Sequence, residues 1–220
     1  MEAPSYLYVF NGADCDFPAG VFHSKEEADA FVREYSLSGT LTRYPIGTLI
    51  YDYALEKGWF EIKREYQRES DFIQQFSSAY LEHFHYERGK GEGESSKEEE
   101  RCERGSDDAN SQRRGFIYVF VGHNAQFPAG LFHSRMEAER YIKKYSLSGY
   151  LTRYPVGVSV YDYMIKTERF RARSQQQRSP KFVQRFANSA AVEYFRYDRG
   201  RADDEFPSLD DLLDESENET

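Results

Sequence analysis

Residues 35–45 form the stretch Tyr-Ser-Leu-Ser-Gly-Thr-Leu-Thr-Arg-Tyr-Pro, and residues 145–155 form Tyr-Ser-Leu-Ser-Gly-Tyr-Leu-Thr-Arg-Tyr-Pro. The two stretches differ only where Thr40 stands against Tyr150. Setting each residue against the one 110 positions later gives further matches. They pair residues 8–10 with 118–120, 17–20 with 127–130, 22–24 with 132–134, and 51–53 with 161–163. Self-similarity over this length indicates an internal duplication, so one small domain occurs twice in the chain.

The duplication divides the chain into four parts. The first repeat covers residues 1–90, a charged linker covers 91–114, the second repeat covers 115–201, and an acidic tail covers 202–220. The linker and the tail contain few apolar residues, which is typical of disordered segments. A flexible linker of this length spans roughly 25–30 Å. The two repeats can therefore reach one another, and one arrangement open to them is an intramolecular pseudo-twofold dimer.

Each repeat alternates short β-like and helix-like patterns. Strands are expected at residues 6–10, 21–22, 40–44 and 81–86. Helices are expected between Ser24 and Gly39, at 50–57 and at 71–77. Ser24 with Glu27 forms the pattern of a capping box, and Gly39 is expected to cap the end of that helix. No regular βαβ period is present. The fold prediction is therefore α+β: two similar small domains, each a short, mostly antiparallel sheet with packed helices.

The cysteines and the hydropathy bear on the cellular compartment. Cys15 aligns with Ala125 and Cys102 lies in the linker, so neither cysteine recurs with the repeat. A disulfide framework would recur with the fold, and a reducing compartment is therefore expected. No apolar run approaches the ~20 residues that span a bilayer. The first residues also lack the pattern of a secretory signal. We expect a cytoplasmic protein that does not contact a membrane.

The formal net charge of -9 conceals very different parts. Residues 6–90 hold 9 Lys/Arg and 14 Asp/Glu, whereas residues 115–201 hold 15 and 6. The tail holds 9 acidic residues and no basic one. Two interpretations stay open: a basic surface on the second repeat for an anionic partner, with the tail as competitor, or pairing of the basic repeat with the acidic repeat or the tail. The candidate basic residues are Arg171, Arg173 and Arg196.

Polar residues retained in both repeats are candidates for binding. They are Arg43, Tyr44 and Asp52 in the first repeat and Arg153, Tyr154 and Asp162 in the second. The Arg43 guanidinium is expected to form an ion pair with Asp52, or its planar fork would bind an anionic ligand. His23 and His133 are also retained, each beside a serine. These serines already serve as helix caps, and no nucleophile motif accompanies them.

His83 and His85 are two residues apart in an expected strand, so both side chains point to one face. That spacing can supply two metal ligands. The second repeat has Tyr194 and Arg196 instead, and no cysteine or carboxylate cluster completes a site. No phosphate-binding loop, dinucleotide fingerprint or zinc motif occurs either. We therefore expect no metal and no cofactor, and the sequence gives no positive support for an enzyme.

The retained blocks resemble a family of small bacterial proteins known only as a domain of unknown function. The blocks in the first repeat are Tyr-Val-Phe at 8–10, Phe-Pro-Ala-Gly-Val-Phe at 17–22, Leu-Thr-Arg-Tyr-Pro at 41–45, Tyr-Asp-Tyr at 51–53 and Glu-His-Phe-His-Tyr at 82–86. The second repeat departs from the last block, where Tyr194 and Arg196 replace both histidines. The resemblance covers both repeats, and it implies no activity.

These observations predict a non-enzymatic protein-binding module, of an immunity or regulatory type, that acts through duplicated domains of divergent charge. One alternative is a small-molecule or nucleotide-binding domain, or an enzyme, that uses the Phe-Pro-Ala-Gly loop with Arg43 and Arg153. Another is nucleic-acid or anion binding by the basic second repeat. That alternative is less favoured, because the acidic tail would cancel much of the attractive field and no nucleic-acid motif is present.

Overall fold

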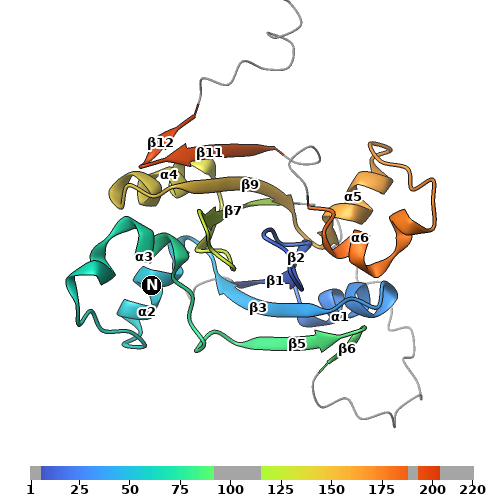
Figure 1. Ribbon diagram of the computed structural model, residues 1–220, viewed down its shortest axis with the longest axis horizontal. Helices are drawn as coiled ribbons and strands as arrows, with labels where there is room; N and C mark the ends of the chain where they lie inside the picture. The colour runs from blue at the N-terminus through green and yellow to red at the C-terminus, as the bar shows by residue number, and fades with distance from the viewer. Residues whose placement is uncertain (1–5, 92–114, 188–192, 204–220) are drawn as a thin grey trace, which may run out of the picture.

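The computed structural model describes residues 6–91, 115–187 and 193–203. The predicted linker with Cys102 and the predicted acidic tail lie almost entirely outside the described residues. The described chain forms two six-stranded antiparallel sheets, which Figure 1 shows as two stacked layers with helices at both sides. The α+β prediction is confirmed.

The first repeat supplies five strands of one sheet and the helix that follows its second strand. These elements are β1 (Tyr6–Gly12), β2 (Gly20–Phe22), α1 (Lys25–Glu34), β3 (Gly39–Pro45), β5 (His83–Glu87) and β6 (Lys90–Gly91). Strand β1 pairs with β2 on one side and with β3 on the other, and β3 pairs with β5. Successive side chains of a strand point to opposite faces. Leu7 and Val9 accordingly pack between the sheets, and Phe10 packs toward α1.

The second repeat builds its sheet from equivalent elements in equivalent order. They are β7 (Phe116–Gly122), β8 (Gly130–Phe132), α4 (Arg135–Lys144), β9 (Gly149–Pro155), β11 (Tyr194–Asp198) and β12 (Arg201–Ala202). We call residues 6–45 with 81–91 the first scaffold and residues 115–155 with 193–203 the second scaffold. Each scaffold provides five strands of a sheet, and the sixth strand comes from the other repeat.

The sixth strands belong to two arms that the repeats exchange. The first arm (residues 46–80) contains β4 (Thr48–Leu49), α2 (Ile50–Glu56) and α3 (Ser70–Gln75). The second arm (residues 156–187) contains β10 (Val158–Ser159), α5 (Val160–Lys166) and α6 (Pro180–Gln184). Strand β4 pairs with β8 of the second scaffold, and β10 pairs with β2 of the first. In Figure 1, α5 and α6 (orange) accordingly lie beside β2 and α1 (blue).

The exchange makes each hydrophobic core a joint product of both repeats. Tyr161 and Val183 of the second arm pack with Phe10 and Phe31 of the first scaffold. Tyr51 and Ile73 of the first arm pack in the same way with Phe120 of the second scaffold. Full burial of such a side chain contributes about 1.5–3 kcal/mol. Each scaffold therefore depends on several apolar side chains that the other repeat supplies.

The start of α1 agrees with the sequence, and its end does not. The Ser24 hydroxyl accepts a hydrogen bond from the Glu27 N–H at 3.3 Å, as a helix cap does. The helix ends at Glu34 and is capped by Tyr35, so the prediction that Gly39 caps it is wrong. Gly39 instead begins β3, where a Cβ atom would lie 2.2 Å from the carbonyl oxygen of Asn11. The close approach of β1 accounts for a glycine here.

Candidate functional site

Retained polar residues connect each arm to the opposite scaffold. The Tyr35 hydroxyl of the first scaffold donates to a carboxylate oxygen of Asp162 at 2.6 Å, and the Tyr145 hydroxyl donates to Asp52 at 2.5 Å. Lys144 also forms an ion pair with Asp52 at 3.5 Å. Burial, assisted by the hydrogen bond to Asp162, raises the pKa of Tyr35. The predicted pair of Arg43 with Asp52 is wrong, because the arm takes Asp52 to the second scaffold.

Two buried glutamines make the same kind of connection. Gln74 of the first arm accepts a hydrogen bond from the Ser148 N–H at 2.8 Å. Its equivalent, Gln184, donates to the carbonyl oxygen of Ala13 at 3.1 Å. The Gln74 backbone also lies against Gly122, where a Cβ atom would be 2.0 Å from the Gln74 carbonyl oxygen. The sequence prediction omitted both glutamines, although their retention in both repeats was a usable signal.

Arg43 and Arg153 lie at equivalent places on the two scaffolds. Arg43 forms an ion pair with Glu82 at 3.3 Å, and its guanidinium carbon lies 4.1 Å from the centre of the Tyr6 ring. Arg153 makes the same contacts with Glu193, at 3.2 Å, and with the Phe116 ring. The structural ion pair expected for these arginines is therefore present, with a different carboxylate.

Tyr44 and Tyr154 were candidates for binding, but both are core residues. They are 1% and 0% exposed and pack between the two sheets. The Phe-Pro-Ala-Gly loop is also structural, because the Ala19 carbonyl oxygen accepts a hydrogen bond from Val160 N–H of the second arm at 3.0 Å. Tyr44, Tyr154 and Ala19 therefore stabilise the fold and the exchange, whereas Phe17 and Phe127, which begin the two loops, line the clefts described below.

His23 and His133 lie next to the helix caps. Their backbone N–H groups donate to Glu27 and Glu137, each at 2.9 Å. The His23 ring lies beside Gly157 of the second arm, where a Cβ atom would be 3.2 Å from the ring. The neighbouring serines, Ser24 and Ser134, accept hydrogen bonds from helix N–H groups. Their hydroxyl groups therefore act as helix caps, which gives them a structural role.

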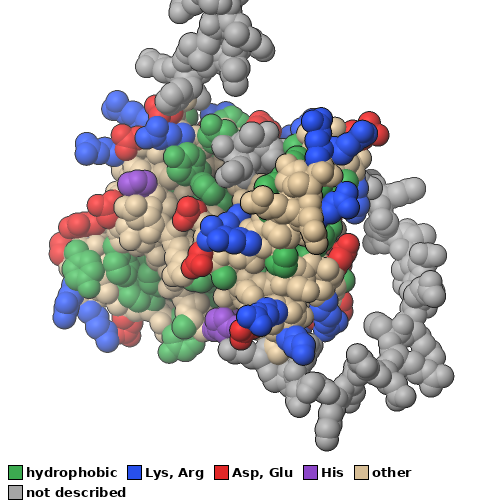
Figure 2. All heavy atoms as spheres, turned by 45° about the vertical axis from the view of Figure 1, so that its right-hand side comes forward, with side chains coloured by type: hydrophobic (Ala, Val, Ile, Leu, Met, Phe, Trp, Pro, Cys, Tyr) green, Lys and Arg blue, Asp and Glu red, His purple; other side chains and the backbone are tan. Residues whose placement is uncertain are grey.

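The basic residues of the second repeat are divided between two places. The second arm holds 7 Lys/Arg and 2 Asp/Glu, and it packs on the first scaffold, which holds 5 and 8. Arg171 and Arg173 belong to this arm, and Arg171 lines a hollow of about 440 Å³ beside Tyr35. Arg196 belongs to the second scaffold and pairs with Asp203 at 3.7 Å. On the face drawn in Figure 2, Lys and Arg side chains are accordingly scattered among acidic ones.

The differences between the repeats gather at two clefts, one beside each sheet. Across the first sheet, Asn11 of β1, Thr40 of β3 and His85 of β5 form a cross-strand row. The equivalent row of the second sheet is Val121, Tyr150 and Arg196, so the residue differs at every position. The loop after the first strand also differs at each of residues 13–16 and 123–126. We call the cleft at the first row the polar cleft and the one beside the second row the aromatic cleft.

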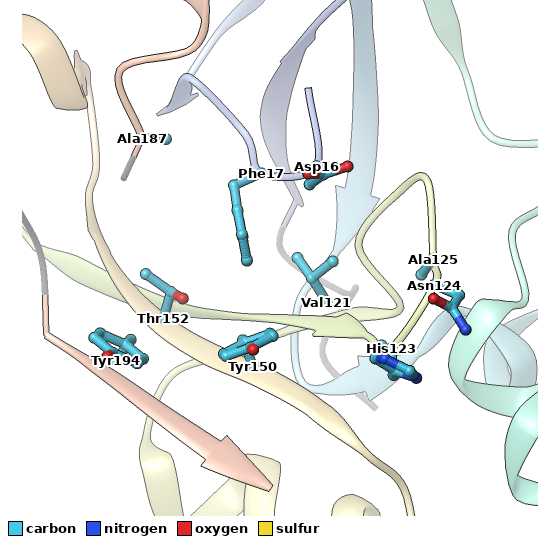
Figure 3. Close-up of a pocket in the computed structure, with 11 residues that line it drawn as sticks. Asp16, Phe17, Val121, His123, Asn124, Ala125, Tyr150, Thr152, Ala187 and Tyr194 are labelled. Atoms are coloured by element: carbon cyan, nitrogen blue, oxygen red, sulfur yellow. The ribbon is translucent and has the colours of Figure 1, made fainter. Parts of the chain in front are cut away.

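The aromatic cleft has a volume of about 480 Å³ and is lined by both repeats. Phe17, from the loop of the first repeat, contacts Tyr150 edge to face with ring centres 5.7 Å apart. Tyr194 continues the aromatic lining 6.3 Å from Tyr150 and is 46% exposed. Figure 3 shows Phe17 pointing from the opposite loop toward Val121 and Tyr150. The cleft therefore presents aromatic surface that solvent can reach.

The polar cleft has a volume of about 660 Å³ and a different lining. The Thr40 hydroxyl and His85 Nδ1 are 3.2 Å apart in a hydrogen bond. Asn11 also lines this cleft; it is 4% exposed, and its amide nitrogen has no hydrogen-bond partner among the described residues. Cys15 donates its thiol to the Gln184 carbonyl oxygen at 3.2 Å, and burial raises the pKa of this thiol.

His83 and His85 do lie together, with ring centres 5.2 Å apart. His83 Nδ1 is hydrogen bonded to the carbonyl oxygen of Leu81 at 2.8 Å. Within the part of the chain that the structure describes, no three His, Cys, Asp or Glu residues form a group that could hold a metal ion. In the same residues no helix has the length and apolar character needed to cross a membrane.

The comparisons with known proteins agree with the duplication. The model of one family, described as a domain of unknown function (DUF7710), matches residues 7–92 and again residues 117–203. This agrees with the resemblance noted from the sequence blocks. No curated protein and no solved structure shows significant similarity to the chain.

Proposed function

Because the chain belongs to this family of domains of unknown function and contains the domain twice, we propose that it is a non-enzymatic binding module that holds a protein partner at its aromatic cleft. One observation is the main support. The two repeats keep the residues that join arm to scaffold, and they differ along the cross-strand row and at residues 13–16 and 123–126, which contribute to the lining of the clefts. Such a pattern is expected when the fold is needed twice and each cleft has its own ligand.

The lining of the aromatic cleft favours a protein as the partner. Tyrosine, phenylalanine and arginine are enriched where proteins meet, and buried aromatic anchors dominate binding energy there. Phe17, Tyr150 and Tyr194 provide the aromatic surface. Arg196 and Arg199 line a neighbouring hollow of about 290 Å³ that shares Tyr150 with the cleft. The partner we propose is an acidic protein segment that inserts an aromatic or aliphatic side chain.

This proposal places the protein among modules that mask a partner's surface, as immunity and regulatory proteins do, and it places the interaction in the cytoplasm. The retained serines cap helices and the retained histidines lie beside those caps, which supports binding over catalysis. Binding of nucleic acid is the weaker alternative, because the exchange sets the most basic segment against the more acidic scaffold.

Site-specific photocrosslinking of the full chain in its native host tests the proposal. A photoreactive p-benzoylphenylalanine replaces Tyr194 in one variant and His83, the equivalent residue of the first repeat, in the other. We expect a covalent protein adduct from position 194 and not from position 83. Adding Tyr150→Thr and Val121→Asn, which introduce the residues of the polar cleft, should abolish the adduct. The crosslinked peptide of the partner should be acidic.

Three results would contradict the proposal. They are the absence of any protein adduct at position 194, equal adducts at both positions, and an adduct that survives Tyr150→Thr with Val121→Asn. Crosslinking to nucleic acid in place of protein would favour the alternative instead.

A further inference from the structure

We propose that the polar cleft is a second, independent binding site, which takes a neutral polyhydroxylated ligand, namely a sugar of one or two rings. This site lies on the first sheet at Asn11, Thr40 and His85. It does not depend on the partner proposed for the aromatic cleft. The inference rests on the size, the hydrogen-bonding groups and the charge of the cleft.

The size and construction of the cleft suit a small molecule. Its volume of about 660 Å³ falls in the range of roughly 300–1,000 Å³ that is usual for ligand pockets. One wall is the strand row of the first scaffold, and the other is the loop of residues 124–127 from the second repeat. Both walls are held by paired strands: the row lies on β1, β3 and β5, and the loop of residues 124–127 follows β7, which pairs with strands on both sides. The site is therefore present before a ligand arrives.

The cleft offers hydrogen-bond donors and acceptors together. Asn11 provides an amide N–H group that no described residue uses; this nitrogen is buried at the base of the cleft, so a ligand oxygen reaches it only when a neighbouring side chain moves aside. Because His85 Nδ1 is hydrogen bonded to Thr40, the other ring nitrogen, Nε2, remains for a ligand. Asp16 adds a carboxylate acceptor, and Asn124 and Gln126 add amides that both donate and accept. A sugar hydroxyl is itself both donor and acceptor, so a polyhydroxylated ring can satisfy this mixture.

The charge of the lining excludes other small ligands. No Lys or Arg occurs among the described residues that line the cleft, whereas Asp14 and Asp16 do. Phosphorylated or carboxylated ligands would be repelled by these carboxylates, and the nearby cation, Arg185, is already paired with Asp14 at 3.9 Å. A purely apolar ligand would leave the buried Asn11 amide without a partner. The half-buried Phe127 ring supplies the apolar surface on which one face of a sugar ring can lie.

The equivalent position in the second repeat strengthens the argument from Asn11. Val121 occupies it, so this place in the fold accepts an apolar side chain. A buried amide without a partner is unfavourable for folding, and the structure gives no folding reason for an asparagine here. A ligand oxygen that accepts from the Asn11 amide would supply that reason.

Saturation-transfer NMR on the full chain tests the site. The probes are D-glucose, D-galactose, D-mannose, maltose, cellobiose and sucrose at millimolar concentration, with glucose 6-phosphate as the anionic comparison. We expect saturation transfer to at least one neutral sugar and weaker transfer to glucose 6-phosphate. Asn11→Val should weaken the binding roughly three- to tenfold, the effect of one lost hydrogen bond.

The second repeat supplies the decisive variant. Thr40→Tyr introduces the residue found at Tyr150, whose ring packs against the phenylalanine of the opposite loop, and it should abolish transfer by filling the cleft. Thr167→Tyr, the same substitution at an exposed position outside the cleft, should leave transfer unchanged. Circular dichroism confirms that each variant is folded. Three results would overturn the proposal: no transfer to any of the six sugars, transfer that persists in Thr40→Tyr, or stronger binding of glucose 6-phosphate than of glucose.

Discussion

The contacts of the exchanged arms and the lining of the two clefts have diverged to very different extents. At the arms, both repeats keep the same tyrosine, aspartate and glutamine. The tyrosine donates to the aspartate in both, and each glutamine accepts from a serine N–H and donates to a loop carbonyl oxygen of the opposite scaffold. At the clefts, the rows Asn11-Thr40-His85 and Val121-Tyr150-Arg196 share no residue. In a duplicated chain, retention therefore marks what the fold needs twice, and divergence marks the surfaces with separate tasks. The following predictions test this comparison, beginning with the largest effect.

Separating the repeats should have the largest effect. Residues 1–91 alone contain an arm without its scaffold and a scaffold without its arm. We expect this fragment to lack a folded monomer in circular dichroism and light scattering, and to gain structure when it is mixed with residues 115–203. The reason is the loss of apolar side chains such as Tyr161 and Val183 from the first core. A stable, folded monomer of residues 1–91 would show that exchange is not required.

Gly122→Ala should destabilise the protein by about 3 kcal/mol, measured by urea unfolding. The new methyl group would lie 2.0 Å from the Gln74 carbonyl oxygen, so the first arm would have to move. Gly58→Glu is the comparison: nothing lies within 4 Å of the Cβ position, and the equivalent residue of the second repeat is Glu168 with a similar left-handed backbone. We expect it to cost about 1 kcal/mol, from the backbone conformation alone. A small effect of Gly122→Ala would mean that the arm is loosely held.

Alkaline pH should weaken the arms. Burial, together with the hydrogen bond to Tyr6, raises the pKa of Tyr53 to about 12, and burial also raises the pKa of Tyr35. An unfolded tyrosine has a pKa of about 10. Between these values the folded state keeps a proton that the unfolded state has lost, so stability falls as the pH rises from about 10 to 12. Urea unfolding at a series of pH values checks this, and Tyr53→Phe should flatten the decline. Stability that does not change over this range would contradict the prediction.

Asn11→Val should stabilise the protein without ligand by about 1 kcal/mol, because it removes a buried amide that lacks a partner. The reverse change, Val121→Asn, should destabilise it by about 1–3 kcal/mol, because it buries a polar group. Thermal unfolding measures both. A loss of stability in Asn11→Val would show that the amide serves the fold, and the contrast between arms and clefts would then weaken.

Arg43→Gln should have the smallest effect, below about 0.5 kcal/mol. Its ion pair with Glu82 joins two side chains that are 40% and 49% exposed, so solvent already screens the charges. Arg153→Gln should behave in the same way, because its pair with Glu193 has the same geometry. A loss above 1 kcal/mol in urea unfolding would place these arginines among the residues that the fold needs.

The elements could be predicted from the sequence, but the exchange could not. Strand alternation and the Ser24 cap are local signals, and they give β1, β3 and α1 nearly in full. The hydrophobic pattern of an arm predicts which face of its helices is buried. It does not predict whether the first or the second scaffold covers that face. Two nearly identical scaffolds offer the same surface. The two-residue strands β4 and β10, where the exchange occurs, are too short for any periodicity.

The candidate site was only partly visible in the sequence. The spacing of His83 and His85 marked them as possible metal ligands, and the positive charge of the second repeat marked Arg196 as a candidate. Asn11 and Tyr150 were not marked in this way, because each occupies an ordinary alternating position of a strand. The single difference between residues 35–45 and 145–155 was the available signal, and the structure places that position in both clefts.

Joining the two exchanged copies in one chain also removes the exact twofold symmetry that a dimer of identical chains would have. If two identical chains exchanged such arms, every mutation would appear in both clefts at once, and neither cleft could change alone. Covalent fusion of two copies removes that restriction, so one cleft can become aromatic while the other stays polar. The same interlocking has an opposite consequence for tolerance to mutation. Because each core contains side chains from both repeats, a destabilising mutation in one repeat weakens both, and the two copies should melt in one transition.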